Sequence, residues 1–413
     1  MSSTHSSDSP RILFYSHDGF GLGHLRRNLK LAQRLVAEEP EASALLIAGV
    51  PGTAGLEPSP GIDMVKLPAI RKVATDSWQP RNLRIELARL QALRRAILDG
   101  VFASFAPHLV VVDYLPLGVW GELREPLSRL RRQHPSAAVV LGLRDVLDSP
   151  LVTRRSWRDQ GHDEGLRQLF DTVHVYGDRA VYDTAAAYGL ADLAARVHFT
   201  GYVCSEGPPP DAEAERRRLG LRAGEELALV TAGGGADAFP MMSVAVQAAR
   251  RLERAGRRLR TLVVTGPLME AGEVAELERL AHGSAVTIQR WRAGLETTMA
   301  AADVVVTMAA YNTLTEALRA GSPVISIPRP GPSAEQVTRA QLFAERGLLR
   351  ALPPHASPER LAGALVDTLT SPRVAVPLPA MDGLQRATAR LRSLLAAATA
   401  GNPEVKHRAG RFA

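Results

Sequence analysis

The chain of 413 residues has one cysteine, few lysines and few aromatic residues. The single cysteine, Cys204, excludes an intrachain disulfide and any metal site built from several cysteines. No run of about 18 apolar residues occurs, and the first ten residues, MSSTHSSDSP, lack the apolar stretch of a signal peptide. We therefore expect a cytoplasmic protein, and we leave open a peripheral association with the inner face of an anionic membrane.

Nearly all the basic residues are arginines, and the formal net charge is +7. A basic balance is typical of proteins that bind nucleic acid, an anionic membrane surface or phosphorylated substrates. Because no basic run with interleaved aromatic residues occurs, we do not expect nucleic acid as a partner.

The length predicts two domains of roughly 150 to 200 residues each. Short apolar runs alternate with helical patterns along the whole chain, which is the βαβ signature of an α/β fold with mostly parallel sheets. The predicted strands of the first half are 12–16, 44–49, 64–68, 108–114, 138–143, 172–177 and 197–203. Those of the second half are 227–233, 261–266, 285–291, 303–309, 323–328 and 348–352.

A stretch rich in proline and charge interrupts this alternation between the two halves. In open parallel sheets ligands bind beyond the carboxyl ends of the strands, so two such domains are expected to face each other across an interdomain cleft. The predicted organisation is a disordered N-terminus (1–10), an N-terminal domain (11–203), a linker (204–220), a C-terminal domain (221–372), a helical segment that could pack on either domain (373–400) and a disordered tail (401–413).

A glycine-rich loop, SHDGFGLGHLRR, follows the first predicted strand and contains Gly19, Gly21 and Gly23. Alternating glycines let the backbone approach a ligand closely, and the helix that begins behind them favours an anion or an oxygen nucleophile. A dinucleotide site is a weak alternative, because His24 replaces the last glycine of that motif and no acidic residue ends the second strand. A tight turn without a ligand is the other alternative.

His24 is the natural general base in this loop, since a histidine at a positive helix end tends to stay neutral and able to accept a proton. Asp18 and Asp113 compete for the role. Asp113 ends a predicted strand, where its carboxylate can orient His24, act as the base itself or only cap a loop.

The second half contains two further candidate segments. The amides of the loop with Gly233, Gly234 and Gly235 can meet phosphate oxygens, and no Lys-Ser or Lys-Thr pair follows that would indicate a Walker-type ATP site. In the segment 308–340, a strand runs into a helix start whose backbone amides suit a diphosphate, at Ala310, Tyr311, Asn312 and Thr313.

Glu316 lies one turn into that helix, where its carboxylate can accept both hydroxyls of a ribose. The alternative is a capping box, in which Thr313 caps the helix and Glu316 bonds only backbone amide. Glu335 and Gln336 favour the first interpretation, because they open the next helix and can bond sugar hydroxyls. No Asp-x-Asp pair exists, so we expect neither a metal nor another cofactor, and helix dipoles would stabilise a departing diphosphate.

These motifs resemble the family 28 glycosyltransferases of GT-B architecture, over both domains and most strongly in the second. The resemblance implies two doubly wound Rossmann-like domains. It implies that Glu316 holds the ribose, that Glu335 and Gln336 contact the donor sugar, and that the glycine loop and the helix start face the diphosphate. The segment 288–291 and the loop after it, with Trp291 and Arg292, are similar to the part that holds the uracil ring. Gly21, Gly23 and His24 correspond to the N-terminal glycine loop and its histidine.

Leu22 separates Gly21 from Gly23, and Ala309 and Ala310 stand where the family commonly has glycine, which favours a bacterial branch distinct from the lipid II enzyme. The resemblance implies an inverting, metal-independent transfer of a hexosyl group, N-acetylated or not, from a UDP-linked donor to the hydroxyl of an unidentified acceptor. Hydrolysis or 2-epimerisation of a nucleotide-sugar is one alternative. A non-catalytic nucleotide-sugar-binding or scaffold protein is another.

Overall fold

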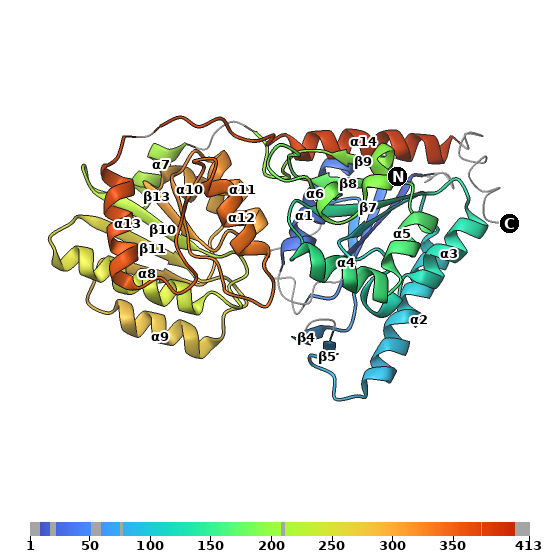
Figure 1. Ribbon diagram of the computed structural model, residues 1–413, viewed down its shortest axis with the longest axis horizontal. Helices are drawn as coiled ribbons and strands as arrows, with labels where there is room; N and C mark the ends of the chain where they lie inside the picture. The colour runs from blue at the N-terminus through green and yellow to red at the C-terminus, as the bar shows by residue number, and fades with distance from the viewer. Residues whose placement is uncertain are drawn as a thin grey trace, which may run out of the picture. The chain divides into compact units, whose positions relative to one another are not determined.

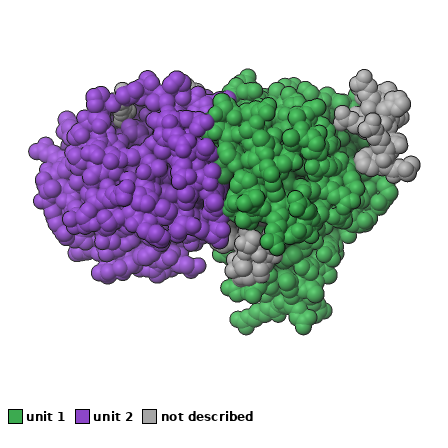
Figure 2. Space-filling model, viewed as in Figure 1, with its two compact units in different colours: residues 1–202, 382–413 green, residues 203–381 purple. Residues whose placement is uncertain are grey.

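A computed structural model describes residues 9–16, 22–50, 59–74, 77–207, 211–372 and 374–400. The chain forms two compact units, shown separately coloured in Figure 2. Unit 1 consists of residues 1–202 and 382–413, and unit 2 of residues 203–381. Residues 1–8 and 401–413, predicted as disordered, lie outside the described residues.

Unit 1 is built on a parallel sheet (Figure 1). The strand order reverses between β1 and β6, and such a reversal in a doubly wound sheet is where ligands bind. Ser16 and Asp113 end these two strands in register. The order across the sheet is β3 (Ile62–Lys66), β2 (Ser43–Ala48), β1 (Arg11–Ser16), β6 (Leu109–Asp113), β7 (Ala138–Arg144), β8 (Thr172–Tyr176) and β9 (Val197–Phe199).

Helices cover this sheet, and the last of them returns from the end of the chain. Helix α14 (Gly383–Thr399) packs on β6, β7, β8 and α1, so it belongs to unit 1. Its first residue has no room for a side chain, since a Cβ at Gly383 would lie 2.3 Å from the Gly201 carbonyl oxygen. The other helices are α1 (Gly23–Glu38), α2 (Leu87–Phe105), η1 (Val119–Gly121), α3 (Arg124–Gln133), α4 (Pro150–Asp159), α5 (His162–Leu169), α6 (Thr184–Ala187) and η2 (Ala191–Arg196).

Unit 2 repeats the architecture with a second parallel sheet, and its order reverses between β10 and β13. The order is β12 (Val286–Gln289), β11 (Leu259–Val264), β10 (Glu226–Thr231), β13 (Val304–Thr307), β14 (Val324–Ser326) and β15 (Arg350–Ala351). Its helices are α7 (Ala212–Arg218), α8 (Phe239–Arg254), α9 (Ala271–Ala281), α10 (Leu295–Ala301), α11 (Tyr311–Arg319), α12 (Glu335–Ala344) and α13 (Pro358–Thr370).

Two features differ from what the sequence suggests. A small antiparallel pair, β4 (Ile70–Ala74) and β5 (Ser77–Pro80), stands apart from the main sheet of unit 1. Helix α7 forms within the stretch predicted as a linker and packs against α10. The linker prediction rested on prolines and charge, but the charge of Glu215 is paired inside unit 2, where its carboxylate accepts hydrogen bonds from Arg292 and Thr298. Among the described residues, no helix has both the length and the apolar character needed to cross a bilayer.

Candidate functional site

The first candidate cluster lies at the strand-order reversal of unit 1, where α1 begins and β6 ends. Asp113 is completely buried there. The Nδ1 atom of His24 lies 3.1 Å from Oδ1 of Asp113. Arg27, one turn further along α1, donates from Nη2 to both carboxylate oxygens, at 2.7 Å and 2.5 Å. The carboxylate therefore holds a histidine and a buried arginine together.

The charge of Asp113 is stabilised where it lies. Burial on its own would raise the pKa of the carboxyl, but the charges and hydrogen bonds of Arg27 and His24 outweigh it and lower that pKa. The Arg27 guanidinium also lies over the ring of Tyr176, 5.2 Å from its centroid. Asp113 is thus an anion at any physiological pH.

The amphipathic pattern of α1 explains why these side chains meet. Leu25 and Leu29 are buried against the sheet, and this orientation turns His24 and Arg27 towards the end of β6. His24 keeps 16% of its side-chain surface exposed. Gly23 is the first residue of α1, whereas Asp18, Gly19 and Gly21 lie outside the described residues.

The glycine loop of unit 2 follows β10 and crosses the end of β11 at close range. Gly233 and Gly235 have φ angles of +70° and +86°, which residues with a side chain rarely adopt. A Cβ on Gly235 would lie 1.8 Å from the Thr265 carbonyl oxygen. The Gly234 carbonyl accepts a hydrogen bond from the amide of Leu268 at 2.9 Å. These contacts hold the loop in one conformation.

We expect Gly235→Ala to destabilise unit 2 strongly, by more than about 2 kcal/mol, because it combines backbone strain with a clash against backbone. Gly363→Ala is the control: that glycine lies within α13, and a Cβ there meets nothing within 4 Å. It should stabilise by about 0.5–1 kcal/mol. Thermal unfolding of both variants checks this, and equal midpoints would contradict it.

Helix α11 begins directly after β13, as predicted, with Ala310 as its N-cap. The capping-box alternative is wrong, because Thr313 is the third residue inside the helix rather than its cap. Oε1 of Glu316 instead accepts hydrogen bonds from the amide (2.9 Å) and hydroxyl (3.0 Å) of Ser205. Ala309, just before the helix, has a φ of +56°, a region of backbone conformation that favours glycine.

Glu335 and Gln336 open α12 and are both mostly buried. Arg339, fully buried one turn later, donates to Oε1 of Glu335 at 2.8 Å and to the Ala309 carbonyl at 3.0 Å. Oε1 of Gln336 accepts from the amide of Arg329 at 3.1 Å. The structure thus connects Glu335 and Gln336 to the start of α11 and to the loop after β14.

Arg329 also forms an ion pair with Asp237, which lies just after the glycine loop. The segments around Gly233–Gly235, Tyr311–Thr313 and Glu335–Gln336 are therefore joined within unit 2. Arg27 and Arg339 are the residues that the sequence analysis missed. Their spacing was the available signal, since Arg27 follows His24 by three residues and Arg339 follows Glu335 by four, so each pair shares one helix face.

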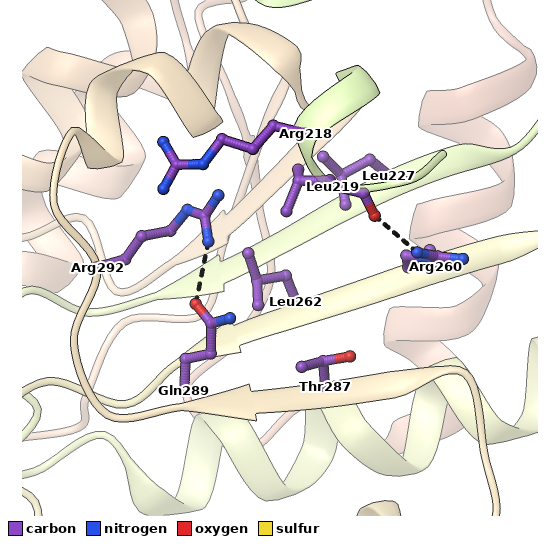
Figure 3. A pocket seen from close by; sticks show the side chains of 8 residues that line it. All are labelled: Arg218, Leu219, Leu227, Arg260, Leu262, Thr287, Gln289 and Arg292. Carbon is purple, nitrogen blue, oxygen red and sulfur yellow. Dashed lines mark hydrogen bonds between the residues drawn. The ribbon is translucent and has the colours of Figure 1, made fainter. Parts of the chain in front are cut away.

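Trp291 and Arg292 follow β12, the edge strand of this sheet. Trp291 is 50% exposed. Arg292 lines a hollow of about 260 Å³ on the sheet, together with two other arginines (Figure 3). Its guanidinium donates to Thr298 (2.7 Å), to Gln289 (3.2 Å) and to Glu215 (2.5 Å). Arg292 thereby connects α7 and α10 to the end of β12 through hydrogen bonds.

No cluster of three or more His, Cys, Asp or Glu side chains suited to a metal occurs within the part of the chain that the structure describes. That no metal takes part stays a prediction, as do the donor-binding and catalytic roles of the individual residues.

Comparison with known proteins finds a family similarity in the second half of the chain. Residues 228–391 match the glycosyltransferase family 28 C-terminal domain. An uncharacterized glycosyltransferase of Methanopyrus kandleri is 27% identical over 203 residues, which is 48% of this chain and 54% of the relative. The chain thus matches about half the length of that relative.

Solved structures resemble the whole chain at low identity. MurG of Acinetobacter baumannii has a TM-score of 0.55 at 13% sequence identity. The match covers 97% of this chain and 98% of the MurG chain. A proposed UDP-N-acetylglucosamine 2-epimerase of Listeria monocytogenes has a TM-score of 0.62 at 14% sequence identity. The match covers 93% of this chain and 96% of the epimerase chain. Medicago truncatula UGT71G1, complexed with UDP-glucose, has a TM-score of 0.53 at 14% sequence identity. The match covers 98% of this chain and 100% of the UGT71G1 chain. The predicted GT-B fold, with two Rossmann-like domains, is confirmed.

Proposed function

Because residues 228–391 match the glycosyltransferase family 28 C-terminal domain, we propose that the protein transfers a hexosyl group from a nucleoside diphosphate sugar to an acceptor hydroxyl. In this proposal the donor is UDP-linked, the anomeric configuration is inverted and no metal takes part. Unit 2 binds the donor and unit 1 supplies the base.

The contact between His24 and Asp113 is the observation that carries this proposal. When Nδ1–H of His24 donates to the carboxylate, Nε2 is the ring nitrogen that accepts a proton. His24 then removes the proton from the acceptor hydroxyl, whose oxygen attacks the anomeric carbon. Asp113 orients the imidazole and stabilises the imidazolium that forms, and its lowered pKa argues against its acting as the base itself.

The departing diphosphate takes the electron pair of the broken bond between the anomeric carbon and oxygen. We assign its stabilisation to the amides at the start of α11 and in the glycine loop, where positive partial charge gathers. Glu316 is only partly buried, and we assign it to the ribose hydroxyls. Its hydrogen bonds to the ribose would replace those that it now accepts from Ser205. The exposed indole of Trp291 is available for stacking on the base.

Donor binding is tested by thermal unfolding of the purified protein with UDP-, dTDP- and GDP-sugars. A true donor at 100 times its dissociation constant should stabilise the fold by about 2.7 kcal/mol, and we expect this for a UDP-sugar. A protein that none of these ligands stabilises would refute nucleotide-sugar binding.

The same sugars, incubated without acceptor, separate transfer from the alternatives. Slow breakdown that an acceptor accelerates supports a transferase. Rapid release of free sugar, or formation of an epimer, would instead identify a hydrolase or a 2-epimerase.

A further inference from the structure

Unit 1 contains a second hollow, of about 350 Å³, whose volume is in the range of small-molecule sites. Residues of β8, β9 and α14 line it, and Figure 1 shows α14 beside these strands. Thr172, the first residue of β8, belongs to its wall. The hollow therefore lies towards the amino ends of the strands, whereas His24 and Asp113 lie at the carboxyl ends of the same sheet.

A buried histidine without partners faces this hollow. His174 is 0% exposed, and neither of its ring nitrogens has a hydrogen-bond partner among the described residues. A neutral imidazole offers one donor and one acceptor, and buried polar groups in folded proteins are nearly always paired with protein, water or a ligand. His198 lies in register with it on β9, with the ring centroids 6.2 Å apart.

The charge around the two histidines is positive. Arg390 of α14 forms no hydrogen bond or ion pair with any described residue. Asp171, the acidic residue in the wall, is already paired with Arg131 at 2.7 Å. Burial first, and then Arg390 and His198, lower the pKa of His174 to about 3. Burial and Arg390 also lower the pKa of His198.

The remaining charged residue of the wall, Arg196 at the end of η2, donates to the Phe170 carbonyl at 2.8 Å. No carboxylate in the wall is therefore left to balance Arg390. A metal cation would be repelled by this arginine, even though imidazoles are good metal ligands. An anion that accepts several hydrogen bonds fits both the charge and the donors.

We propose that this hollow binds a phosphoryl group, as inorganic phosphate or as a phosphate monoester, through Arg390, His174 and His198. A guanidinium pairs with two phosphate oxygens at once, and an imidazole N–H donates to a third. A bound dianion also favours protonation of the two histidines, which strengthens these contacts. The site is separate from the donor and base sites and does not depend on the proposed function.

The test is an NMR titration of the full chain labelled with 15N-histidine, in which phosphate replaces chloride at constant ionic strength. The His174 and His198 ring signals are assigned with His174→Gln and His198→Gln. We expect phosphate to shift both signals and to raise the pKa of His198. Reading these two signals excludes any phosphate that binds to the glycine loop of unit 2.

Arg390→Gln should weaken phosphate binding at least tenfold, and Arg390→Lys should keep part of the affinity. The side chain is exposed, so neither variant should unfold the chain. The matched control is Arg386→Gln, an exposed arginine on the same helix that is not in the wall. Equal loss in both glutamine variants, or ring signals that phosphate does not move, would overturn the proposal and leave a hollow filled by water.

A hexose monophosphate as a second probe distinguishes the two sources of the group. Tighter binding than inorganic phosphate supports a phosphate monoester as the ligand. Binding of inorganic phosphate alone supports the free ion.

Discussion

His24→Ala should lower the rate of sugar transfer by about 10² to 10⁴-fold, the usual contribution of a positioned general base. The affinity for UDP, measured by calorimetry, should stay at the wild-type value, because His24 lies in unit 1 and the predicted donor residues lie in unit 2. Such a variant separates the loss of the base from the loss of donor binding.

The control is His134→Ala, which removes an exposed histidine at the end of α3 and should leave both quantities unchanged. If His24→Ala kept the transfer rate, another group would be the base. If it abolished UDP binding, the role assigned to the residue would be wrong.

The strands were predictable from the sequence because parallel strands that are buried on both faces are continuous apolar runs. Leu109, Val110, Val111 and Val112 of β6, for example, are all completely buried. All thirteen predicted strands lie on the strands of the two main sheets. The β4–β5 pair was missed, since it stands outside these sheets and its sequence is mixed in polarity.

The candidate site was predictable only in part. That Asp113 ends a strand at an edge where ligands bind follows from the strand pattern. That it contacts His24, which is 89 residues away in the chain, depends on the strand order and on how α1 packs. The hydrogen bond from Arg339 to the Ala309 carbonyl likewise joins residues 30 apart in the chain. Local patterns hold no information on such contacts, so Glu316 fitted a capping box equally well before its bonds to Ser205 were known.

Asp113→Asn should reduce both activity and stability, and this is the second large effect that we expect. The amide cannot stabilise an imidazolium as a carboxylate does, so the transfer rate should fall by about 10² to 10⁴-fold. The variant also leaves the Arg27 guanidinium, 1% exposed, without its counter-charge. Breaking a buried pair in this way costs about 3–5 kcal/mol.

The effect on stability has a pH dependence of its own. The pKa of Asp113 is lower in the folded protein than the unfolded value of about 3.9, so its stabilisation is fully present above that pH and is lost as the pH falls through the folded pKa. Thermal unfolding between pH 7 and pH 2 should therefore show a smaller acid-induced loss of stability for Asp113→Asn than for the wild type.

Arg27→Met provides the comparison, because it leaves the Asp113 carboxylate in contact with His24 but removes the buried cation. It should destabilise the fold to a similar degree and lower the transfer rate less than Asp113→Asn does, when both are assayed at a temperature at which circular dichroism shows them folded. Equal losses of rate would mean that Asp113 acts only by holding the fold together, and the orienting role would then fall to another residue.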